Sequence, residues 1–197
     1  MVEHAQQHTL AGTAEQTPAP VTRERLHRRT IVIDGYRRSD GLWDIEGELH
    51  DVKAVDHGLK TYVHPANVPM HHMKLRITVD DTLTIRDAGA VTLAAPYNPE
   101  CAAASQTYDN LKGVQIKAGF RAEVARRLGT GMGCTHISEL LGSLATAAVQ
   151  TTAGLLPAND EAPPLQLGSC YAYRESGALV REHYVKWYRP ETPEPPI

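Results

Sequence analysis

The segment Gly131–Thr152, GMGCTHISELLGSLATAAVQTT, places a thiol and an imidazole at the start of an apolar helix. Its apolar residues recur at helical spacing, at Ile137, Leu140, Leu141, Leu144 and Ala148. Thr135 is the predicted N-cap, so Cys134 and His136 fall at a helix N-terminus. There the helix dipole favours a thiolate and a neutral imidazole, the forms that bind metal ions. The alternative is that Cys134 is a small buried residue of the core.

The composition is that of an ordinary globular protein. The 197 residues, of which 42% are hydrophobic and 22% charged, allow one compact domain with loose ends. We expect a disordered tail over residues 1–22, a single α+β domain over residues 23–189 and a flexible tail over residues 190–197. The net charge of −3 gives no electrostatic reason to bind nucleic acid. The sequence also lacks an apolar run for a membrane span or a secretion signal, so a cytoplasmic location is expected.

Two kinds of periodicity predict the elements of the domain. Alternating apolar and polar residues predict strands at Thr30–Asp34, Trp43–Leu49 and Met73–Val79. After a turn at Asp80–Asp81, the segments Leu83–Arg86 and Ala88–Ala95 complete a hairpin or a three-stranded meander, and a terminal hairpin is predicted from Cys170–Tyr173 and Ala178–Tyr184. Helical spacing predicts three helices, at Cys101–Leu111, Phe120–Leu128 and Gly131–Thr152. This order indicates an α+β fold in which an antiparallel sheet packs on helices.

Histidines and cysteines stand at the predicted starts of several elements, at His71, His72, Cys101, Cys134, His136 and, as a further thiol, Cys170. Such ligands suit zinc or iron, and we expect one ion per chain. Successive side chains of a strand point to opposite faces. Therefore one of His71 and His72 is expected to be a ligand, which leaves the other for a different task.

One resemblance to a known family rests on the motifs MKLRITVDD and IRDAGAV. It also rests on a Cys that opens an Ala/Ser-rich helix and on a Cys/His pair that opens the last helix. Over Pro69–Thr152 the chain resembles the iron–sulfur scaffold family of the IscU/NifU type. The resemblance implies an IscU/NifU-like core with extra N- and C-terminal strands, and His71, Cys101 and Cys134 as ligands, with His136 shifted from the family's adjacent pair. The family's first Cys, near Pro69, is absent here, which favours a mononuclear site over a sulfide-bridged cluster.

A second resemblance covers nearly the whole chain. The segments GYRRSDGLWDIEGELHD, MHHMKLRITVDD, GCTH and CYAY resemble a bacterial domain-of-unknown-function family. The occurrence of that family in degraders of aromatic compounds implies a role in small-molecule catabolism.

The segment GYRRSDGLW is the remaining candidate for substrate binding. Arg37 and Arg38 could hold a carboxylate or phenolate, and Tyr36 and Trp43 could form an aromatic wall. A solvated turn followed by a core tryptophan is the alternative interpretation.

Two functions of different classes follow. The first is a metal-dependent lyase that cleaves a C–C bond of a small molecule, such as an aromatic acid, with His72 or Asp40 moving a proton. The second is a non-catalytic metal or iron–sulfur carrier. A homo-oligomer is compatible with either function, and the sequence leaves the oligomeric state open.

Overall fold

A computed structural model describes residues 21–156 and 161–191 of the protein. The predicted tails, residues 1–22 and 190–197, lie almost wholly outside these ranges. Within the described residues, no helix is long and apolar enough to cross a membrane.

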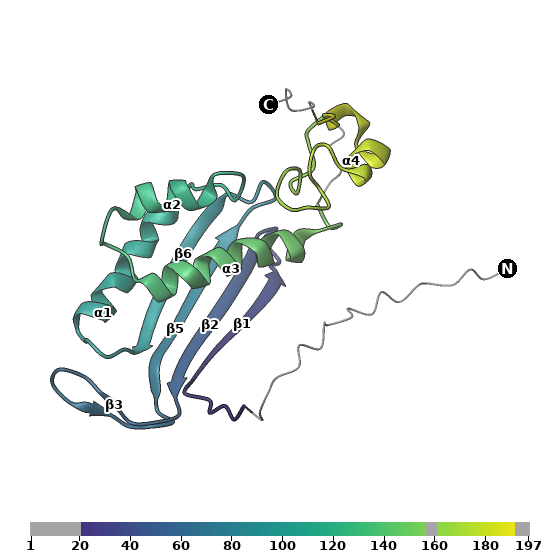
Figure 1. Ribbon diagram of the computed structural model, residues 1–197. Helices are drawn as coiled ribbons and strands as arrows, with labels where there is room; N and C mark the ends of the chain where they lie inside the picture. Colours follow the sequence, from purple (N-terminus) through teal and green to yellow (C-terminus); the bar gives the residue numbers. More distant parts are fainter. Residues whose placement is uncertain (1–20, 157–160, 192–197) are drawn as a thin grey trace.

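The centre of the fold is a four-stranded antiparallel sheet with the order β1-β2-β5-β6 (Figure 1). Its strands are β1 (His27–Arg37), β2 (Trp43–Lys53), β5 (Pro69–Val79) and β6 (Ile85–Ala94). The segment between β2 and β5 carries a small ribbon made of β3 (His57–Gly58) and β4 (Val63–His64). The α+β class with an antiparallel sheet packed on helices is thus confirmed.

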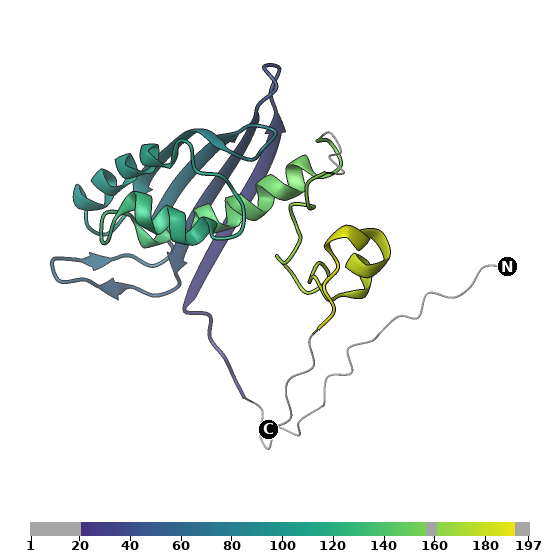
Figure 2. The ribbon, with the colours of Figure 1, turned by 90° about the horizontal axis from the view of Figure 1, so that it is seen from above.

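Helices cover one face of this sheet (Figures 1 and 2). They are α1 (Glu100–Ala103), which continues as the 3-10 helix η1 (Ala104–Leu111), then α2 (Phe120–Leu128) and α3 (Thr135–Thr152). The long helix α3 contacts β1, β2 and β5. Cys134 is the N-cap residue of α3, one position before the predicted Thr135.

Strand β2 shows how the sheet separates its two faces. Trp43, Ile45 and Leu49 point toward the helices and are buried, whereas Asp44, Glu46 and Glu48 on the other face are at least partly exposed. Gly47 lies at the point where α3 crosses β2, because a Cβ atom built there would fall 2.9 Å from Leu140 Cδ1. The missing side chain therefore allows the close approach of helix and sheet.

The C-terminal segment corrects one expectation. Residues 170–177 form turns, and Ala178–His183 forms the helix α4, followed by the 3-10 helix η2 (Val185–Trp187). The predicted strands Cys170–Tyr173 and Ala178–Tyr184 are therefore wrong, and the sheet has no C-terminal strand within the described residues. Ala, Leu, Arg and Glu in ALVREH are strong helix formers, and the turns before them offer no strand for pairing.

Candidate metal centre

A cluster of two imidazoles and one carboxylate lies where α3 begins, on the helix-covered face of the sheet. Asp51 of β2 and His71 of β5 are register partners, and His136 comes from the first turn of α3. Asp51 Oδ2 lies 3.2 Å from His71 Nδ1 and 3.6 Å from His136 Nε2. The two imidazole rings stack with their centroids 3.8 Å apart. We call these three residues the inner cluster, and their ligand atoms all lie within 4.8 Å of one another.

The carboxylate of the inner cluster is buried but stays ionised. Asp51 is 3% exposed. Arg29 of β1 donates to both of its oxygens, through Nε at 2.8 Å and Nη2 at 2.7 Å, and His27 Nε2 lies 3.0 Å from Oδ1. Burial by itself raises the pKa of Asp51, but the hydrogen bonds and charges of Arg29 and His27 outweigh it and hold the pKa at about 2. A second carboxylate, Glu139 of α3, pairs with the other end of the Arg29 guanidinium.

The imidazoles of the inner cluster favour their neutral form. Burial lowers the pKa of His71, and the neighbouring His136 lowers it further. Burial is also the main cause that lowers the pKa of His136. His71 Nδ1 is buried and, although close to Asp51, has no partner with hydrogen-bond geometry among the described residues. Two neutral ring nitrogens beside an ionised carboxylate form a donor set that suits a borderline divalent cation.

Cys134 borders the inner cluster on its far side. Its Sγ atom lies 3.8 Å from His136 Nδ1 and 3.9 Å from Met73 Sδ. Because Asp51 faces the other ring nitrogen, Nε2, the thiol stands behind His136. From there it can orient the imidazole that Asp51 faces.

Cys101, the other predicted cysteine ligand, belongs to a different part of the fold. It lies in α1, where its N–H donates to Tyr97 O and its carbonyl accepts from Thr92 Oγ1. Within the described residues it makes no contact with the inner cluster. Cys170 is exposed in the C-terminal turns.

The predicted substrate turn lies at the other end of the sheet. Trp43 opens β2 and Asp51 stands near its end, a separation of about 26 Å at ~3.3 Å per strand residue. Arg38 donates to Asp40 at 2.7 Å and to Asp44 at 3.3 Å, and Trp43 is buried with its Nε1 donating to Asp81. Tyr36 is exposed, and the guanidinium of the neighbouring Arg37 lies over the Trp43 ring. These residues and Asp40 therefore share no pocket with the inner cluster, and a binding role for them stays a prediction.

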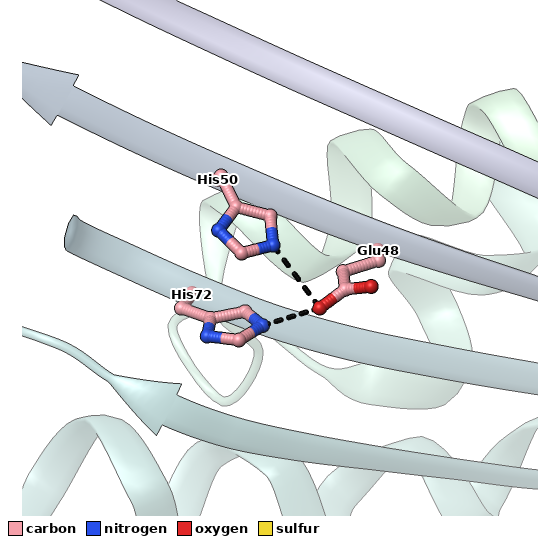
Figure 3. Close-up of side chains that lie close together, drawn as sticks. All are labelled: Glu48, His50 and His72. Carbon is pink, nitrogen blue, oxygen red and sulfur yellow. Dashed lines mark hydrogen bonds and ion pairs between the residues drawn. The ribbon is translucent and has the colours of Figure 1, made fainter.

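His72 belongs to a second cluster on the opposite face of the sheet (Figure 3). Its Nε2 lies 2.5 Å from Glu48 Oε1, and His50 Nε2 lies 3.0 Å from the same oxygen. We call Glu48, His50 and His72 the outer cluster. The expectation that His71 and His72 point to opposite faces is confirmed. The sheet separates His72 from the inner cluster, so His72 cannot exchange a proton with a substrate bound there.

Sequence reasoning missed the carboxylate on which the inner cluster depends. The apolar series Trp43, Ile45, Gly47 and Leu49 continues by alternation to Asp51. A carboxylate at an inward position must have partners, since an unpaired buried charge is very costly. The position of Asp51 in this alternation was therefore the signal that could have identified it.

The chain belongs to the family described as "Protein of unknown function (DUF2889)", whose model matches residues 27–150. The match spans β1 to the last turns of α3 and includes every residue of both clusters. No curated protein and no solved structure matches the chain.

Proposed function

We propose that the protein is a metal-dependent enzyme that holds one zinc or iron ion through Asp51, His71 and His136. The observation that carries the proposal is His71 Nδ1, a buried nitrogen that lies 3.2 Å from the Asp51 carboxylate but has no partner with hydrogen-bond geometry in the part of the chain that the structure describes. An unsatisfied buried polar atom costs about 1–3 kcal/mol. A cation bound to both residues removes this cost, because it accepts the nitrogen lone pair and offsets the charge of the carboxylate.

The surrounding residues support this role. Arg29 orients the carboxylate and keeps it ionised, while part of its guanidinium pairs with Glu139. Zinc or iron bound here would supply a Lewis acid that polarises a substrate oxygen. His27 touches Asp51 and has a half-exposed side chain, so it is the candidate proton carrier on this face in place of His72.

For the reaction itself we propose the C–C bond cleavage expected from the sequence, with a carboxylated aromatic compound as substrate. Such a cleavage needs an electrophile that withdraws electrons through a carbonyl or carboxylate oxygen, which is the chemistry of a Lewis acid. Arg29, which contacts Asp51 of the inner cluster, would take the place of Arg37 and Arg38 as the cation close to a substrate anion.

A non-catalytic metal carrier is the second candidate. The observation that favours it is the separation of about 26 Å between the inner cluster and the Arg37–Trp43 turn, at ~3.3 Å per strand residue. A carrier needs the ligands but has no need of a substrate pocket beside them.

Metal analysis followed by turnover assays tests the proposal. Protein purified without a histidine tag should contain zinc or iron at the inner cluster, and His136→Ala should remove it while the circular dichroism spectrum stays unchanged. The metal-loaded protein should then release carbon dioxide or an aldehyde from a panel of hydroxybenzoates and aryl 2-oxo acids. His27→Ala should keep the metal but lower turnover by about two to four decades. Metal binding without turnover across the panel would favour the carrier, and metal content that His136→Ala leaves unchanged would refute both functions.

A further inference from the structure

The outer cluster lies on the face of the sheet that α1, α2 and α3 leave uncovered (Figures 1 and 3). Glu48 and His50 are alternate residues of β2, and His72 of β5 is the register partner of His50. Both strands are central in the sheet order β1-β2-β5-β6. The three side chains therefore project from rigid, hydrogen-bonded strands rather than from loops.

The ligand atoms of the outer cluster converge to the spacing of a coordination shell. His50 Nε2 and His72 Nε2 lie 3.0 and 2.5 Å from the same oxygen, Glu48 Oε1, and all three atoms lie within 4.8 Å of one another. Ligands bound at ~2.1 Å stand about 3.0 Å apart at right angles and about 3.4 Å apart in a tetrahedron. Small side-chain movements are thus enough to place one ion between the three atoms.

The two imidazoles of the outer cluster can bind a cation in place of their hydrogen bonds to Glu48. The two rings stack with their centroids 3.9 Å apart, and both direct Nε2 at the same oxygen, Glu48 Oε1. Without an ion, each neutral ring must carry its proton on Nε2 to donate to Glu48 Oε1. The Nδ1 atoms make no hydrogen bond within the described residues, so they can take the proton when Nε2 binds a metal.

We propose that Glu48, His50 and His72 form a second metal site, which takes a borderline divalent cation such as Zn²⁺ or Fe²⁺. Two imidazoles and one carboxylate are the donor set that these ions prefer, whereas Ca²⁺ and Mg²⁺ require mostly oxygen ligands. Three protein ligands on an uncovered sheet face leave coordination positions open. The site is independent of the inner cluster, because the sheet lies between them.

Lys74 provides a charge that distinguishes a metal site from a group of hydrogen bonds. Its Nζ atom lies 3.5 Å from Glu48 Oε1 on an exposed side chain, so it competes with any cation at the outer cluster. Removing this charge should strengthen Zn²⁺ binding about two- to fivefold, as expected for one exposed ion pair. Hydrogen bonds between Glu48 and the histidines have no reason to produce that effect.

Calorimetric titration of Zn²⁺ into metal-free His136→Ala protein isolates the outer cluster. One equivalent should bind, and Lys74→Ala in this background should bind it more tightly. Adding His50→Ala or His72→Ala should each abolish binding, and Glu48→Gln should weaken it at least tenfold, with unchanged circular dichroism spectra as the control for folding. Failure of His136→Ala to bind Zn²⁺, or binding that survives the combined loss of His50 and His72, would overturn the second site. The inner cluster is tested separately, by comparing the number of Zn²⁺ equivalents that the wild type and His136→Ala bind. The wild type should bind one more.

Discussion

His71 and His72 are neighbours in the chain, yet their imidazoles stack on different partners on opposite faces of the sheet. His71 lies against His136 of α3, and His72 lies against His50 of β2. Each ring also faces its own carboxylate, Asp51 for His71 and Glu48 for His72. The two adjacent histidines therefore serve two separate clusters.

Replacing each of these histidines by alanine should remove a different metal ion. We expect His71→Ala to lose the Zn²⁺ bound at the inner cluster and His72→Ala to lose the Zn²⁺ bound at the outer cluster. The double variant should lose both equivalents, because the sites share no ligand. Equilibrium dialysis with elemental analysis measures the stoichiometry. If the double variant lost only as much metal as either single variant, the two histidines would serve one site.

Cys134→Ser should weaken metal binding at the inner cluster without abolishing it. The thiol lies beside Nδ1 of His136, whereas Nε2 faces Asp51, so the thiol acts through the orientation of the ring. Losing such a supporting contact lowers metal affinity about 10–100-fold. Competition with a chelator of known affinity measures the change, and Cys101→Ser is the matched control that should leave affinity unchanged. Complete loss of the ion would instead show that Cys134 is itself a ligand, as the sequence resemblance implies.

Gly47→Ala should destabilise the fold by about 1–3 kcal/mol, the usual cost of overpacking. A Cβ at this position would collide with Leu140 and Leu144 of α3. Gly89 of β6 is the matched control, because a Cβ there meets nothing within 4 Å. Gly89→Ala should be neutral or stabilise the protein by about 0.4–1 kcal/mol through the unfolded state. Urea denaturation measures both, and equal effects would mean that α3 does not pack closely on Gly47.

Asp80→Asn should reduce stability in a manner that depends on pH. The carboxylate accepts the N–H groups of Thr82 at 2.9 Å and Thr84 at 3.0 Å and pairs with Arg86. Burial raises the pKa of Asp80, but these partners outweigh it and leave the pKa below its ordinary value.

The direction of the pH effect follows from that shift. Since the folded pKa lies below the unfolded value of about 3.9, the carboxylate stabilises the protein fully above that pH and loses its contribution as the pH falls through the folded pKa. Wild type and Asp80→Asn should thus differ by about 1–2 kcal/mol at pH 7 and converge as the pH falls through the folded pKa. Urea midpoints across this range measure the difference, and a gap that widens on acidification would contradict the assignment.

Local sequence patterns predicted most elements of the fold. The alternation from Trp43 to Leu49 and the helical spacing from Ile137 to Ala148 predicted β2 and α3, because each pattern records which side of an element faces the core. The helix Ala178–His183 was wrongly predicted as part of a strand, because six residues are too few to distinguish a short helix from a strand.

The candidate site was only partly predictable for a different reason. His71, Cys134 and His136 are indeed close together, and strand alternation correctly separated His71 from His72. Glu48 and His50 were missed, since cross-strand register decides their neighbours and no local pattern encodes it. The alternation along β2 indicates that Asp51 points inward, but its partners on β1, β5 and α3 again depend on the register and on helix packing. The distance from the inner cluster to the Arg37–Trp43 turn likewise depends on the length of β2, not on chemistry that the sequence displays.

The cluster that each of the two histidines joins depends on whether its position along β5 is odd or even. Met73, Leu75 and Ile77 are fully buried, and they assign every second residue of the strand to the helices. His71 belongs to this odd-numbered series and His72 to the even-numbered one. An insertion of one residue between His72 and Met73 would leave the core in place but exchange the parity of both histidines. His72 would then enter the pocket of Asp51 and His136, and His71 would face solvent, so the spacing to the core, rather than the imidazole itself, gives each histidine its task.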